Sequence, residues 1–114
     1  MKPRTALLLA AALAVLAGCA RRNLTAPELY STYCARCHGD QGKGKGEPED
    51  LILYPHLNLL ASPMVRGGDR AAVRQRIREG YGPMPGFARR LTPQELERLV
   101  DFTFQLQRTS KERP

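Results

Sequence analysis

The sequence predicts an all-α fold, a single small domain of three or more helices. Two segments begin with a threonine that is followed three residues later by glutamate, at Thr25 and at Thr92, each with a proline in the first turn. This pattern is the capping box that starts a helix. No run of residues alternates between apolar and polar as a half-buried strand does. A length of 114 residues has room for one domain.

The first predicted helix begins after Thr25 and runs toward Cys34 and Cys37, with Leu29 and Tyr30 among its apolar residues. The second begins after an N-capping aspartate and ends at a glycine, a common helix stop. The third follows Thr92 and repeats its apolar residues at helical spacing. The markers of these two helices are Asp69, Val73, Ile77 and Gly80 for the second, and Leu96, Leu99, Val100, Phe102 and Leu106 for the third.

Two segments outside these helices are predicted to be irregular. Residues 38–68 are rich in glycine and proline, and a loop of that length in a compact domain usually wraps something. Residues 108–114 are predicted as a frayed polar tail.

The beginning of the chain has the pattern of a bacterial export signal. Lys2 and Arg4 precede an apolar run over residues 6–17, which is shorter than the roughly 20 residues a membrane-spanning helix needs. The run ends in Leu-Ala-Gly and Cys19, which resembles the lipobox of bacterial lipoproteins, where the signal is removed before a cysteine that carries lipid. An ordinary secretory signal is the alternative. The predicted division is residues 1–18 as signal, 19–24 as lipidated cysteine and tether, 25–107 as the folded domain and 108–114 as the tail.

Cys34, Cys37 and His38 form C-x-x-C-H, the attachment signature of c-type haem. Cysteines three apart near the end of a helix share a face, so each thiol can add to one vinyl group of the porphyrin. The histidine that follows at once presents a ring nitrogen to the iron as proximal ligand. We therefore predict one covalently bound haem c. The export signal agrees with this, because bacteria attach haem c outside the cytoplasm.

Two other chemistries use a similar motif. A structural zinc site needs four ligands, and only His56 and Cys19 are available beyond the pentapeptide. A thioredoxin-like redox pair is expected in a βαβ context, which the sequence lacks.

The stretch from Pro27 to Leu106 resembles the small single-haem class I cytochromes c. That family has an aromatic residue four before the first haem cysteine, a C-H-G-x-x-G-x-G continuation, an Ile-x-x-Gly approach to Met-Pro-x-Phe, and Leu-x-x-Phe in the last helix. The corresponding residues here are Tyr30, 37–44, Ile77 to Gly80, Met84 to Phe87, and Leu99 to Phe102. The chain departs from the family at Ala26, where a glycine usually lets two helices cross closely.

The sixth iron ligand is predicted to be Met84, which lies between Pro83 and Pro85 and so has a restricted backbone. Met64 and His56 are the alternatives. Ligation by histidine and methionine gives a fairly high reduction potential. The resemblance also implies a proline whose carbonyl accepts the other N–H of the proximal histidine. The residues considered for that role are Pro55, which is preferred, and Pro48.

These features predict an electron-transfer protein rather than an enzyme, with no small-molecule substrate. The main hypothesis is a one-electron carrier anchored by lipid on Cys19 to a bacterial membrane, facing the periplasm or another extracytoplasmic side. The alternative is the haem-bearing subunit of a larger membrane-associated oxidoreductase. A gas sensor or haem carrier would need a vacant or weak sixth position, which Met84 argues against. Ala20 favours the outer membrane, because an aspartate there would signal retention in the inner one.

The expected partners are redox proteins. They are expected to present acidic docking surfaces, and nucleic acid is not expected outside the cytoplasm. Five arginines around the second predicted helix form either a docking patch or a solvated helix face. They are Arg66, Arg70, Arg74, Arg76 and Arg78.

Overall fold

The computed structural model describes residue 3, residues 23–44 and residues 57–113. The last two ranges form, in order, α2 (Ala26–Tyr33), α3 (Ala35–His38), the 3-10 helix η3 (Leu59–Ala61), α4 (Pro63–Arg66), α5 (Arg70–Glu79) and α6 (Pro93–Glu112). In this part of the chain, β pairing is limited to two isolated bridges. The predicted all-α fold is confirmed.

The predicted helix starts are present as hydrogen bonds. At α2, the Glu28 carboxylate accepts from both the backbone N–H and the hydroxyl of Thr25, each at 2.8 Å. At α6, the hydroxyl of Thr92 accepts from the backbone N–H of Glu95 at 3.2 Å. At α5, the Asp69 carboxylate accepts from a backbone N–H of the first turn at 3.0 Å. Each cap satisfies donors that the helix itself leaves unpaired.

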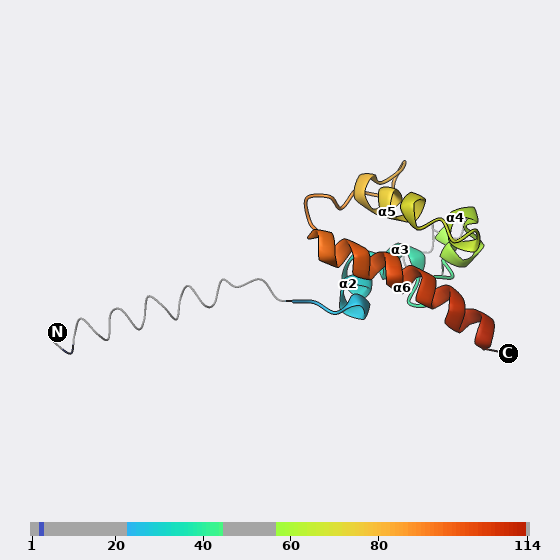
Figure 1. Cartoon of the computed structure of the whole chain (residues 1–114), viewed down its shortest axis with the longest axis horizontal. Coiled ribbons are helices and arrows are strands. Elements are labelled where there is room, and N and C mark those ends of the chain that lie inside the picture. The colour runs from blue at the N-terminus through green and yellow to red at the C-terminus, as the bar shows by residue number, and fades with distance from the viewer. Residues whose placement is uncertain (1–2, 4–22, 45–56, 114) are drawn as a thin grey trace.

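The core is organised by α6, which crosses the domain and packs against α2, α4, α5 and η3 (Figure 1). The least accessible side chains lie where α2 meets α6, at Leu29, Leu99 and Val100. At the same crossing the rings of Tyr30 and Phe102 lie 5.1 Å apart. The first and last helices of the domain therefore hold each other through large apolar side chains.

The helix predicted to run from Thr25 through the haem motif is interrupted at Cys34, whose φ of −120° and ψ of −40° are not helical. The backbone N–H of Cys34 still bonds to the Tyr30 carbonyl at 2.8 Å, and the N–H of His38 bonds to the Cys34 carbonyl at 2.9 Å. The hydrogen bonding continues across Cys34, and α3 begins directly after it. The haem motif thus occupies its own turn, α3.

The sequence predicted that residues 38–68 are irregular, and this prediction is wrong for part of the stretch. η3 and α4 lie within it, and residues 45–56 lie outside the described part. The Asn58 side chain caps η3 by accepting from the backbone N–H of Leu60 at 3.0 Å, and Pro63 opens α4. Helices of three or four residues are too short to produce an apolar periodicity, which is why the sequence did not indicate them.

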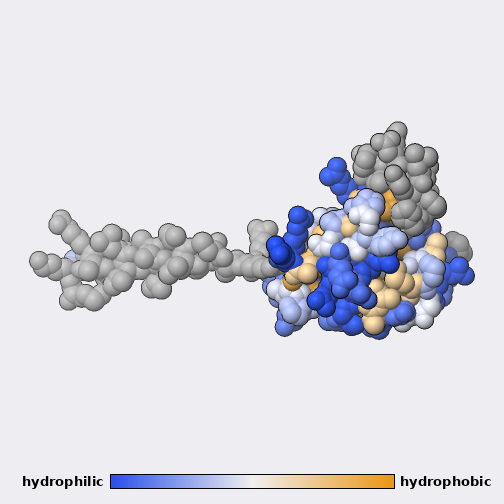
Figure 2. Space-filling view, turned by 90° about the horizontal axis from the view of Figure 1, so that it is seen from above, coloured by the Kyte–Doolittle hydropathy of each residue, from blue (hydrophilic) through white to orange (hydrophobic). Residues whose placement is uncertain are grey.

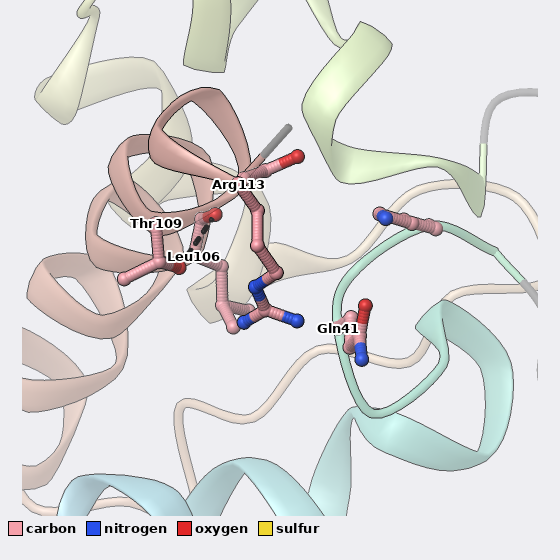
Figure 3. Close-up of a pocket in the computed structure, with 6 residues that line it drawn as sticks. Gln41, Leu106, Thr109 and Arg113 are labelled. Atoms are coloured by element: carbon pink, nitrogen blue, oxygen red, sulfur yellow. Dashed lines mark hydrogen bonds between the residues drawn. The ribbon is translucent and has the colours of Figure 1, made fainter.

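The expected frayed tail is wrong up to Glu112, because α6 continues to that residue. Leu106 anchors this extension by packing against the loop that follows α3, where a Cβ at Gly42 would lie 3.4 Å from it. Beyond it, polar residues of the last turns face the same loop across a cavity of about 110 Å³ (Figure 3). Its lining residues are Gln41, Lys43, Leu106, Thr109, Ser110 and Arg113.

The surface is largely hydrophilic, and on the face in Figure 2 apolar residues reach it in separate patches. Tyr81 is the large apolar side chain that stands out among the described residues, with 72% of its surface exposed. No helix in the described ranges is both long enough and apolar enough to span a bilayer. The predicted signal and Cys19 lie outside those ranges.

Candidate haem-binding site

The three residues of the haem motif lie together on one turn. Cys34 is half-buried, Cys37 is exposed, and the two thiols are not joined in a disulfide. His38 is half-buried at the end of α3. The turn therefore offers two thiols and an imidazole at one edge of the core.

The thiol of Cys34 is not set up for redox chemistry of its own. Burial, and secondarily the neighbouring Cys37, raises the pKa of Cys34 to about 12. Reactive thiols in C-x-x-C redox pairs have lowered pKa values, because the thiolate is the nucleophile. The thioredoxin-like alternative is therefore disfavoured on chemical grounds as well as by the fold.

The His38 ring is oriented by the backbone of a distant segment. Its Nδ1 lies 2.8 Å from the carbonyl oxygen of Leu57. A carbonyl only accepts, so Nδ1 carries the hydrogen and donates it. In the neutral ring this leaves the lone pair on Nε2, the form in which imidazole binds a metal, and the hydrogen bond raises its basicity.

Leu57 is not the residue that the sequence analysis chose for this role. Pro55, the predicted acceptor, and Pro48 both lie outside the described residues, and the acceptor that the structure gives to Nδ1 is two residues after Pro55. Pro55 begins a Pro-x-Leu stretch in which Leu57 is the third residue. An acceptor that is a backbone carbonyl has no side-chain signature, so the sequence alone does not single out Leu57.

Leu57 is held in place by the loop that follows His38. The Leu59 N–H bonds to the Gly42 carbonyl at 2.8 Å, and the Gly44 N–H bonds to the His38 carbonyl at 2.8 Å. Gly44 has a φ of +77°, and a Cβ there would lie 3.0 Å from the backbone nitrogen of Asn58. The glycine spacing after the haem motif therefore permits two backbone segments to pass closely and to orient the histidine.

Tyr30 connects this loop to the core. Its hydroxyl donates to the Gly39 carbonyl at 2.7 Å, and only 3% of the side chain is exposed. Burial raises the pKa of Tyr30 well above its usual value, so the phenol stays protonated and remains a donor. This is a physical reason for an aromatic residue four positions before the first haem cysteine.

Met84, the predicted second iron ligand, lies in the loop after α5. Its backbone forms a two-bond hairpin with Tyr81, with both N–H···O distances at 3.0 Å, and its side chain is half-buried against the core. Met64, the alternative ligand, is also half-buried and lines a cavity of about 240 Å³ with Gly80 and Tyr81. The structure thus brings both methionines to the same part of the molecule. His56 lies outside the described residues.

The residues present suit a haem. The donor set consists of two thiols, an imidazole with its Nε2 lone pair, and a thioether, which are the groups that hold a c-type haem. Cys34, Tyr33 and Met84 are partly buried side chains that pack against the core and still offer apolar surface to a ligand. In residues 23–44 and 57–113, no three histidine, cysteine, aspartate or glutamate side chains gather as a metal-ion site would require.

One curated relative is the Cbb3-type cytochrome c oxidase subunit FixP of Azorhizobium caulinodans. It is 34% identical over 80 residues, which are 69% of this chain and 25% of that protein. The chain thus spans about a quarter of the length of the relative it matches. No solved structure matches this chain.

The family match covers the whole candidate site. Residues 22–102 match the family described as cytochrome C oxidase, cbb3-type, subunit III. This span runs from before α2 to the middle of α6 and contains both the C-x-x-C-H turn and the Met84 loop. It covers well over half of the chain, and the fold agrees with a cytochrome c domain. The chain belongs to this cytochrome c family.

Proposed function

We propose that this domain is the haem-bearing electron-transfer part of a membrane-associated oxidoreductase of the cbb3-oxidase type. The family match and the likeness to an oxidase subunit support this over the freestanding carrier that the sequence analysis placed first. The observation that carries the haem chemistry is His38, whose ring is oriented by Leu57 so that Nε2 is the metal-binding nitrogen.

A bound c-type haem supplies an iron that gains and loses one electron. Cys34 and Cys37 would hold the ring covalently, and His38 and Met84 would ligate the iron. With both of these ligands supplied by the chain, electron transfer would need no substrate at the metal. The hydrogen bond from its Nδ1 to the Leu57 carbonyl keeps the His38 imidazole in one orientation.

The partner is proposed to be a redox protein with an acidic surface. Of the five arginines of the predicted patch, two are occupied within the domain, since Arg70 pairs with Asp101 and Arg74 pairs with Glu97, both on α6. The Arg76 guanidinium lies 4.4 Å from the centre of the exposed Tyr81 ring.

Two arginines of the predicted patch stay available. Arg66 and Arg78 are exposed and form no ion pair with any described residue. We assign the attraction for an acidic partner to these two residues together with Arg76, because exposed charges steer transient electron-transfer encounters.

A second candidate function is a lipid-anchored carrier that works alone. The observation that favours it is the lipobox-like sequence ending in Cys19, which would tether the domain to the membrane on its periplasmic side. The outer membrane is then favoured by Ala20. Both candidates use the same haem chemistry and differ in whether the domain stays with other subunits.

The two candidates are separated by purification of the tagged full chain from membranes in mild detergent. For an oxidase subunit, we expect haem-stained protein to migrate in a native gel with other redox subunits, and to do so in Cys19→Ser as well once solubilised. Migration as a single haem protein in several mild detergents contradicts the subunit proposal. Loss of membrane attachment in Cys19→Ser, with labelled fatty acid absent, supports the lipid anchor in either case.

A further inference from the structure

We infer that Gly80 and Gly86 are positioning residues that hold Met84 at the iron, because the chain has no room for a Cβ at either place. The inference rests on the proposed role of Met84 as axial ligand. It concerns the seam between the end of α5 and residues 84–86, which is built from backbone atoms alone.

The contact at Gly80 is the closest in the seam. Gly80 ends α5 with a φ of +74°, and a Cβ built there would lie 2.4 Å from the Met84 carbonyl oxygen and 2.6 Å from the Gly86 nitrogen. These neighbours are backbone atoms, so they cannot rotate away as the end of a flexible side chain would. Room for the Cβ requires residues 84–86 to move as a segment.

The contact is reciprocal. A Cβ at Gly86 would lie 2.7 Å from the Arg78 carbonyl oxygen and 2.8 Å from the carbonyl carbon and oxygen of Glu79. Each of the two segments therefore leaves no room for a side chain on the other. Gly86 does not have a positive φ, so alanine there would meet the steric conflict alone. The close approach is a property of the packing and does not depend on the left-handed conformation of Gly80.

The seam is fastened on both sides of Met84. After it, the Phe87 N–H bonds to the Ile77 carbonyl at 3.0 Å, and the Phe87 ring is buried 5.5 Å from the ring of Tyr33. Before it, Met84 is bonded to Tyr81 through both of its backbone groups. Because Phe87 is buried and the hairpin is exposed, an added Cβ is expected to displace Met84 rather than Phe87.

Two other glycines have a positive φ but no close neighbour, so substitutions there test backbone strain without a steric conflict. Gly82 lies in the same hairpin with a φ of +53°, and Gly68 precedes α5 with a φ of +71°, yet a Cβ at either would meet nothing within 4 Å. Alanine at these positions suffers the strain of a left-handed conformation without a steric conflict. Gly82→Ala and Gly68→Ala are therefore matched controls.

The experiment compares four haem-loaded full-length variants with the wild type: Gly80→Ala, Gly86→Ala, Gly82→Ala and Gly68→Ala. We expect the first two to lose the weak long-wavelength charge-transfer band of a sulfur–iron bond, to have a lower reduction potential, and to bind carbon monoxide when ferrous. We expect all four to keep haem on a denaturing gel, and the two controls to keep the band. If Gly80→Ala does not fold, Gly86→Ala carries the test without backbone strain.

The outcomes test the role of the two glycines separately from the proposed role of Met84 as iron ligand. A wild type without the band refutes Met84 as ligand, whatever the glycines do. A band that persists in both Gly80→Ala and Gly86→Ala, with an unchanged potential, refutes the seam as the positioning device. In the Met84→Ala background, Gly80→Ala should leave the potential where Met84→Ala puts it, and a further fall would show that Gly80 acts by another route.

Discussion

The two sides of the candidate site are built differently. On the proximal side, Cys34, Cys37 and His38 lie at one turn, where the Leu57 carbonyl orients the His38 ring and the buried Tyr30 hydroxyl bonds to the next residue, Gly39. On the distal side a single methionine is held by backbone contacts between a helix end and a loop. A short motif predicts the proximal chemistry directly, whereas the proposed distal ligand has no such motif and lies where two backbone segments approach closely.

The largest expected effect is on the proximal side. In the double variant Cys34→Ala with Cys37→Ala, haem should no longer stay with the denatured protein, because no thioether bond can form. Peroxidase staining of a denaturing gel measures this. Met84→Ala is the control and should stain like the wild type, since it lies outside the attachment turn. Stain in the double variant, or haem extracted from the wild type by acidified organic solvent, contradicts covalent attachment.

The next effect is on the distal side. Met84→Ala should lose the sulfur–iron charge-transfer band, lower the reduction potential and open the ferrous iron to carbon monoxide, because the thioether stabilises the ferrous state. Met64→Ala and His56→Ala should retain the band. Loss of the band in Met64→Ala alone would identify the other methionine, which lies in the same region. If the wild type lacks the band and His56→Ala opens the iron to carbon monoxide, the iron has two histidine ligands.

The sequence predicted the all-α fold and the helix starts, whereas its assignments of haem-site residues stay predictions. Capping boxes at Thr25 and Thr92 are local hydrogen-bond patterns, so α2 and α6 begin where expected. The acceptor for His38 was assigned to Pro55 rather than Leu57, because any residue can supply a carbonyl. The Gly80–Gly86 seam was also missed, since two glycines six residues apart do not reveal that their backbones touch.

The end of α6 shows the same limit on a larger scale. Residues after Leu106 are mostly polar, which predicts fraying, and only the packing of Leu106 against the loop after the haem motif explains why the helix continues. Helix propensity is a weak prior that tertiary contacts override. Local signals thus located the chemistry, while tertiary contacts decided how the chain supports it.

A smaller effect concerns the support of the proximal loop. Tyr30→Phe removes the hydroxyl that donates to the Gly39 carbonyl and leaves that buried acceptor without this donor. The free energy of unfolding should fall by about 0.5–1.5 kcal/mol, the usual net contribution of one hydrogen bond, because the Gly39 carbonyl still accepts from the Gly42 N–H at 3.1 Å. Chemical denaturation of the haem-loaded protein measures it. The control is Tyr33→Phe, which should change stability by less, and an equal loss in both variants contradicts a specific role for the Tyr30 hydroxyl.

The smallest expected effect concerns the ion pair that joins α5 to α6. The Arg74 guanidinium donates two hydrogen bonds to the Glu97 carboxylate and so joins α5, which leads into the Met84 loop, to α6. The hydrogen bond from Arg74 lowers the pKa of Glu97 below its usual value. A carboxyl whose pKa is lower in the folded state adds stability above its unfolded pKa, and this stability disappears as the pH falls through the folded value.

Arg74→Gln should therefore lower the thermal midpoint at neutral pH by less than Tyr30→Phe does, because exposed ion pairs contribute little. The deficit should vanish at a pH below the lowered pKa of Glu97, where the carboxyl is protonated in both proteins. Parallel unfolding curves across the pH range measure this, with Arg66→Gln as the control, since Arg66 forms no ion pair with a described residue. A deficit that stays constant with pH would mean that Arg74 stabilises α5 by packing.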